Sequence, residues 1–115
     1  MTEGSEDYQR LVEQKRFLGE IEQGIRLANR KSIHKRIPSI DKDNFLDFAT
    51  TVARLRARYL EAAFKLGVNE QGDPPDQSQV TELRTRREMF EEARTAFEAL
   101  REAIEKGYVD VEGID

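Results

Sequence analysis

Apolar residues recur every three to four positions along three stretches of the chain, at about residues 5–31, 43–66 and 77–106. This spacing gathers apolar side chains on one face of an α-helix, so each stretch is predicted to be an amphipathic helix. The second and third stretches have regular seams, which contain Phe45, Val52, Tyr59 and Leu66 in one and Leu83, Phe90, Phe97 and Ile104 in the other. A seven-residue repeat sustained over this length favours left-handed, coiled-coil-like packing between helices.

The first stretch has a less regular apolar row. Its apolar members are Leu11, Leu18, Ile21, Ile25 and Ala28. Gln14 is a polar residue in the same row, and Gly19 and Gly24 each cost about 1 kcal/mol relative to alanine inside a helix. The pattern still predicts a helix with one apolar face, which another helix has to cover.

Prolines and glycines separate the predicted helices. Pro38 lies in the first connection, and Pro74 and Pro75 lie in the second, where they prevent the helix from continuing. Gly107 ends the third helix. After it, residues 108–111 give a faint indication of a strand.

Aspartates stand where the second and third helices begin. Asp41 or Asp43 can cap the first amides of the second helix. Asp76 is followed three residues later by Gln79, which is the spacing of a capping box. The third helix is therefore predicted to begin directly after Asp76.

These elements indicate a single domain of the all-α class over residues 1–115. Short connections make consecutive helices antiparallel neighbours. We therefore expect an antiparallel three-helix bundle with coiled-coil-like packing, followed by an acidic tail over residues 107–115. The alternative is a helical hairpin of the second and third helices that dimerises into a four-helix bundle.

Composition removes several kinds of functional site. The chain has no cysteine and a single histidine, His34, which excludes disulfides, thiolate zinc sites, cysteine nucleophiles and a metal site of several histidines. It has no phosphate-binding glycine loop and no serine–histidine–aspartate arrangement. We therefore expect a protein that is not an enzyme and uses no cofactor or metal. Its acidic first residues and its lack of a long apolar run indicate a cytoplasmic protein without a membrane partner.

One segment is strongly basic. Charged residues make up 37% of the chain and its net charge is only −4, but between Arg30 and Arg36 it reads RKSIHKR, with four fixed positive charges and no acid. The candidate binding residues of this basic segment, which we define as residues 26–37, are Arg26, Arg30, Lys31, Ile33, His34, Lys35, Arg36 and Ile37. A purely structural explanation exists too, because basic side chains favour a helix C-terminus and isoleucines can pack under the end of a bundle.

The leading functional hypothesis is a non-catalytic protein–protein interaction module, such as an adaptor, an accessory subunit or a chaperone-like protein. Apolar residues combined with steering charges are typical of protein interfaces, and positive charge favours a partner with an acidic surface. A homodimer is a separate possibility, as in the dimeric four-helix alternative. The competing hypothesis is a nucleic-acid-binding protein that uses the same cluster to contact phosphates.

Arginines also lie on the two later helices. Arg86 occupies a seam position and Arg56 flanks the other seam, so each is expected to reach a carboxylate or to extend its charged end into water. Arg87, Arg94 and Arg101 repeat every seven residues, with a glutamate four residues after each. Pairs at this spacing stabilise a helix by about 0.2–0.5 kcal/mol each, which favours a self-paired solvent face over a row of phosphate ligands.

Overall fold

The computed structural model describes residues 3–68 and 72–113 and contains three long helices. They are α1 (Glu3–His34), α2 (Lys42–Gly67) and α3 (Gln77–Glu105), and two short strands, β1 (Ser39–Ile40) and β2 (Asp110–Val111), complete the fold. The prediction of an all-α protein is confirmed, and the helix bounds lie close to those expected from the apolar pattern.

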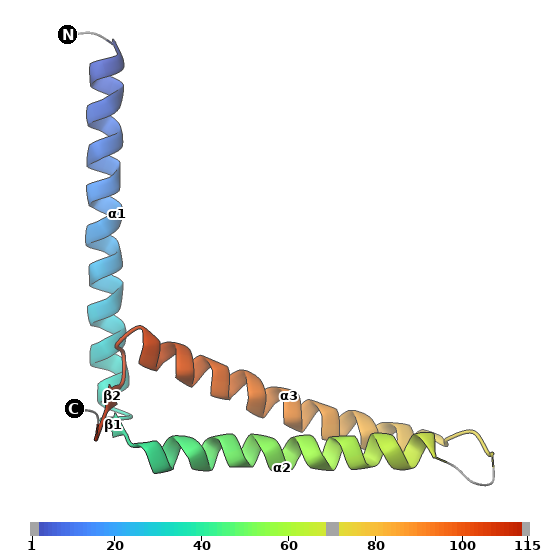
Figure 1. Ribbon diagram of the computed structural model, residues 1–115. Coiled ribbons are helices and arrows are strands. Elements are labelled where there is room, and N and C mark those ends of the chain that lie inside the picture. The colour runs from blue at the N-terminus through green and yellow to red at the C-terminus, as the bar shows by residue number, and fades with distance from the viewer. Residues whose placement is uncertain (1–2, 69–71, 114–115) are drawn as a thin grey trace.

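Helices α2 and α3 form a hairpin and run in opposite directions (Figure 1). Their seams meet through aromatic side chains. The ring of Phe97 stacks on Phe45 at 4.7 Å between centroids and meets the edge of Phe48 at 5.5 Å. Further along, Tyr59 stacks on the buried Phe90 at 6.1 Å. Such ring pairs stabilise beyond the apolar area that they bury, so the hairpin is the best-packed part of the molecule.

Side-chain caps fix where both hairpin helices begin. Asp41 caps α2, since its carboxylate accepts a hydrogen bond of 2.7 Å from the amide of Asn44. Asp76 caps α3 by accepting from the amide of Gln79 at 2.8 Å, and its own amide donates back to the Gln79 side chain at 2.9 Å. The predicted capping box is therefore present, and of the two candidates for α2 the first is the cap.

Helix α1 does not join the hairpin, so the expected three-helix bundle is not the arrangement that the structure shows. Figure 1 shows α1 extending away from the hairpin, with only its C-terminal end beside the other elements. The reason lies in the connection after α1, where β1 pairs with β2 and so places the start of α2 beside the C-terminal segment. The hairpin on which the four-helix alternative was based is present.

A two-stranded parallel sheet joins the three helices at one end. Ser39 is opposite Asp110 and Ile40 is opposite Val111, and the side chains of Ile40 and Val109 are buried there. The faintly indicated strand over residues 108–111 thus appears as β2, whereas its partner β1 was not predicted. The described part of the acidic tail, up to residue 113, packs at this junction, and residues 114–115 lie outside the described part of the chain.

Candidate interaction surface

The apolar row of α1 lies in solvent. The exposed fractions are 64% for Leu11, 57% for Leu18, 45% for Ile21 and 51% for Ile25. Ala28, in the next turn of the same row, is exposed as well. The apolar pattern predicts a helical face that must be covered, and no element of the described chain covers it.

The basic segment occupies the last three turns of α1 and the turn that follows. Residues 26–34 are helical, and the turn is closed by the amide of Ile37, which donates to the carbonyl of Ile33 at 2.7 Å. Ile33 is half-buried, and the other seven candidate side chains are exposed. The structure therefore brings the candidates together at the end of α1 where the fold joins.

Arg30 binds the C-terminal segment of its own chain. Its guanidinium lies 2.9 Å from a carboxylate oxygen of Asp110 and donates to the carbonyl of Gly107 at 3.0 Å. The Nδ1 atom of His34 lies 3.8 Å from the other carboxylate oxygen of Asp110. Arg30 thus has a structural role in holding β2 against α1, which the sequence did not indicate, and His34 lies near the same carboxylate.

Four basic side chains of this segment line a shallow hollow on α1. It measures about 470 Å³ and is lined by Leu27, Arg30, Lys31, His34 and Lys35. Leu27 was not among the candidates, although an exposed leucine one turn before a cationic cluster is a usable indication. The hollow combines one apolar side chain, Leu27, with basic side chains, which suits an amphipathic partner.

Arg26 belongs to a different hollow, between α1 and the end of α3. This space of about 680 Å³ is lined by Glu22, Ile25 and Arg26 from α1 and by Glu105, Lys106, Gly107 and Tyr108. Ile25 is the last large member of the apolar row. The row therefore continues directly into an open space at the base of the hairpin.

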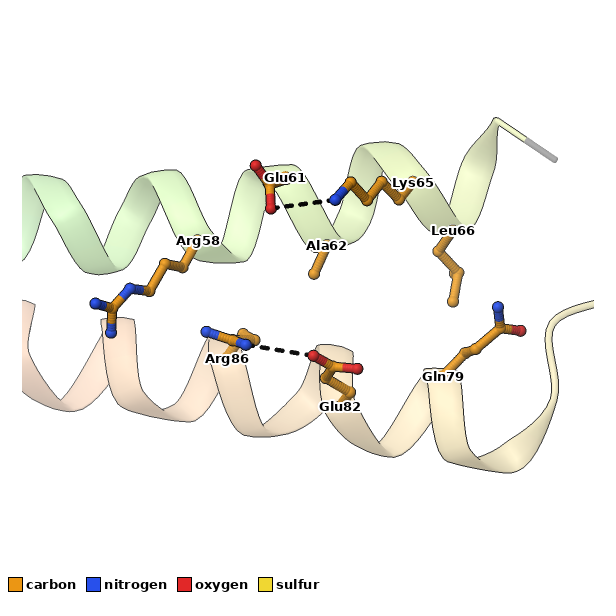
Figure 2. A pocket seen from close by; sticks show the side chains of 8 residues that line it. All are labelled: Arg58, Glu61, Ala62, Lys65, Leu66, Gln79, Glu82 and Arg86. Atoms are coloured by element: carbon orange, nitrogen blue, oxygen red, sulfur yellow. Dashed lines mark hydrogen bonds and ion pairs between the residues drawn. The ribbon is translucent and has the colours of Figure 1, made fainter.

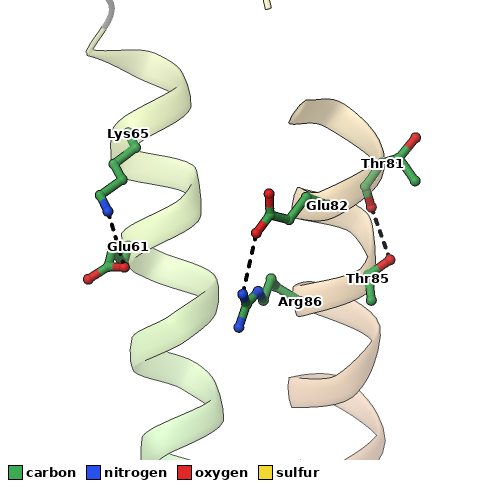
Figure 3. A network of polar contacts seen from close by, with 6 residues as sticks. All are labelled: Glu61, Lys65, Thr81, Glu82, Thr85 and Arg86. Atoms are coloured by element: carbon green, nitrogen blue, oxygen red, sulfur yellow. Dashed lines mark hydrogen bonds and ion pairs between the residues drawn. The ribbon is translucent and has the colours of Figure 1, made fainter. Parts of the chain in front are cut away.

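The hairpin has a small hollow of its own near its loop, of about 300 Å³ (Figure 2). Arg58, Lys65 and Arg86 line it together with Glu61 and Glu82. Arg86 reaches Glu82 at 3.3 Å and Lys65 reaches Glu61 at 3.4 Å, so two of the cations are paired within their own helices (Figure 3). The prediction that Arg86 reaches a carboxylate is confirmed. The pairing leaves little net charge to attract an anionic ligand.

Three other arginines of the hairpin are also engaged. Arg56 lies 5.1 Å from the centre of the Phe90 ring, and Arg94 lies 5.6 Å from the same ring. Of the three pairs that the seven-residue arginine spacing predicts, the contacts of the described residues show one: Arg101 contacts Glu105 at 3.1 Å, whereas Arg94 lies over the Phe90 ring. Cations over an aromatic face stabilise the hairpin itself, so this face is not a row of free charges.

Neither metal-binding residues in the described part of the chain nor similarity to known proteins indicates a second candidate site. Within residues 3–68 and 72–113 there is no group of three or more acidic, histidine or cysteine side chains placed to hold a metal ion. In the same residues, no helix combines the length and the apolar character needed to cross a membrane. Comparisons of the chain with protein-family models, curated proteins and solved structures give no match.

Proposed function

We propose that this protein is a non-catalytic interaction module that binds another protein through α1. The observation that carries the proposal is the exposed apolar row of α1, which runs into the basic segment at the hairpin end. The hairpin forms the folded body, and α1, a helix about 48 Å long at 1.5 Å per residue, extends from it and is held only at its C-terminal end (Figure 1).

Burial of the exposed apolar row would drive α1 to bind a partner. Burial of a leucine or isoleucine side chain stabilises by about 1.5–3 kcal/mol, and α1 leaves four such side chains in a single row in solvent. Contiguous apolar surface of this kind on a small protein commonly marks an interaction site. A helix laid along the row would bury it in the way that seams pack in coiled coils.

The charges of the basic segment define the chemistry of the partner. Lys31, Lys35 and Arg36 are exposed beside the apolar row, whereas Arg30 is occupied by Asp110. Rim charges of this kind accelerate association with an oppositely charged surface more than they raise affinity. The partner that fits best is an amphipathic helix whose polar edge is acidic.

Affinity capture from lysate tests the proposal with two variants. One replaces Leu18 and Ile21 with aspartate, and the other replaces Lys31, Lys35 and Arg36 with glutamate. Both are expected to lose the proteins that the wild-type chain captures, with the apolar variant losing more. Circular dichroism has to show that the hairpin of each variant remains helical.

A matched control reverses the same number of charges elsewhere. Arg54, Arg84 and Arg87 are exposed on the hairpin, so their triple change to glutamate is expected to leave the captured proteins unchanged. If both α1 variants captured the same proteins as the wild type, the proposal would be wrong. Retardation of short DNA or RNA that weakens steeply with salt would favour nucleic-acid binding instead.

A further inference from the structure

We propose that the partner of α1 is the α1 helix of a second copy of this chain, bound in antiparallel orientation. This inference rests on the proposed function and names the partner. The acidic stretch of amphipathic helix that the basic segment requires is present in the chain itself, as residues 3–14 of α1.

Charge is distributed unevenly along α1. Residues 3–14 of α1 carry Glu6, Asp7 and Glu13 with Arg10 as their one cation, and Lys15 and Arg16 follow. The other end carries the basic segment, in which no acid occurs. An antiparallel pair places each acidic start beside the basic end of the other copy, whereas a parallel pair brings like charges together at both ends.

The apolar rows match in this orientation. When Leu18 of one copy lies opposite Ile21 of the other, Leu11 falls opposite Ala28, and the same pairs repeat by symmetry in the other half. Gln14 then faces Ile25, where a long polar side chain can reach water past the seam. The overlap extends over nearly the whole of α1, so every exposed large residue of the row gains a neighbour.

Residues beside the row are complementary in the same register. Lys15 of one copy lies next to Glu22 of the other, an opposite-charge pair that occurs twice by symmetry. Phe17, which is exposed in the single chain, lies next to Gly24. A side chain at Gly24 would meet nothing within 4 Å in the single chain, so packing within one chain does not explain this glycine.

The register also contains one unfavourable pair and one open space. Arg10 lies next to Lys31 of the second copy, with Asp7 one turn away to offset the repulsion. The hollow between α1 and the end of α3, which Ile25 helps to line, lies where the second helix passes the base of the hairpin. Because α1 extends away from the hairpin (Figure 1), an antiparallel pair of α1 helices places the two hairpins at opposite ends of the dimer.

Cysteine cross-linking distinguishes the two orientations, since the chain has no cysteine of its own. In the proposed register Asp7 lies opposite Ser32. We expect a mixture of Asp7→Cys and Ser32→Cys chains to form mostly mixed disulfide dimers under mild oxidation, at least tenfold more than either variant forms alone. Disulfides between equal variants, with few mixed ones, would indicate a parallel dimer and overturn the proposal.

Light scattering then measures the mass of the full chain. We expect twice the mass of one chain for the wild type, and a single-chain mass for the variant with Leu18→Asp and Ile21→Asp. The control carries Leu60→Asp and Phe64→Asp, which change exposed residues of α2, and it is expected to remain a dimer. A dimer lost in the control but kept in the α1 variant would assign self-association to the hairpin and overturn the inference.

The outcomes separate this inference from the proposed function. A single-chain mass for the wild type at all concentrations would overturn the homodimer. If the α1 variants still lost captured proteins in that case, α1 would remain an interaction surface for a different protein. If they lost none, both proposals would fall together.

Discussion

The guanidinium of Arg30 binds the carboxylate of Asp110 at 2.9 Å and the carbonyl of Gly107 at 3.0 Å, across most of the length of the chain. This contact holds the segment after α3 against the end of α1. The backbone continues the attachment, because the amide of Glu112 donates to the carbonyl of Ile40 at 2.9 Å. The base from which α1 extends is therefore built from the C-terminal turns of α1, from β1 and from the segment that follows α3.

Removing the charge of Asp110 should loosen this base without unfolding the hairpin. In an Asp110→Asn variant, we expect the amide of Glu112 to exchange hydrogen faster and the free energy of unfolding to fall by about 0.5–1 kcal/mol, because the ion pair is half-exposed. Hydrogen exchange followed by mass spectrometry measures the first effect. Faster exchange throughout α2 would contradict the expectation, since the contact does not involve that helix.

The stability of the hairpin should depend on Phe90. Its ring is buried, stacks on Tyr59 and lies beneath Arg56 and Arg94. A Phe90→Ala change is expected to lower the free energy of unfolding by about 3 kcal/mol, as measured by urea denaturation. Phe64 is 68% exposed, so Phe64→Ala provides a control with the same change in composition and little effect. Equal losses for the two variants would show that the assigned seam is wrong.

The cap of α3 can be tested by separating charge from hydrogen bonding. Asp76→Ala removes the acceptor for the amide of Gln79 and should cost about 1 kcal/mol of stability. Asp76→Asn keeps an acceptor oxygen at the same place and should cost much less. Thermal unfolding of both variants measures the difference. A large loss in the asparagine variant would assign the effect to charge instead.

The parts of the fold that follow from local pattern could be predicted from the sequence. Seven-residue spacing identified the seams that contain Phe45 and Phe90, and the Asp76 capping box required only the spacing of two residues. Both depend on neighbours within a few turns of one helix. The same reasoning located the basic segment, because a charge cluster is visible without knowledge of the fold.

The parts that depend on distant pairing could not be predicted. The β1–β2 pair has two residues in each strand, too few to show a periodic pattern. The contact of Arg30 with Asp110 depends on that pairing, so no local sequence pattern near either residue indicates it. An apolar row such as that of Leu11 and Leu18 shows that burial of a helical face is favourable, but it does not specify which surface covers that face.

The pair of Glu102 and Lys106 on α3 should give a measurable pH signature. The Lys106 ammonium, 2.9 Å away, donates to the Glu102 carboxylate and lowers the pKa of that carboxyl below its ordinary value of 4.5, while the same contact raises the pKa of Lys106. The stabilisation is therefore present at neutral pH, is lost as pH falls through the lowered pKa of Glu102, and is also lost as pH rises through the raised pKa of Lys106. In Lys106→Gln, a carboxyl NMR titration should show the pKa of Glu102 rising towards its ordinary value, and an unchanged pKa would contradict the contact.

Helix α1 should gain helicity when Gly19 is replaced by alanine. A β-carbon there would meet nothing within 4 Å, and alanine favours a helix interior over glycine by about 1 kcal/mol. Because a helix without tertiary contacts is only marginally stable, this change should slow hydrogen exchange in α1 and leave the exchange of α2 and α3 unchanged. Gly24→Ala serves as the contrast, because the second copy's Phe17 packs beside that position in the proposed dimer. At high protein concentration, Gly24→Ala should slow hydrogen exchange in α1 less than Gly19→Ala does. If the two changes slowed it equally at all concentrations, no side chain of a second copy would pack beside Gly24.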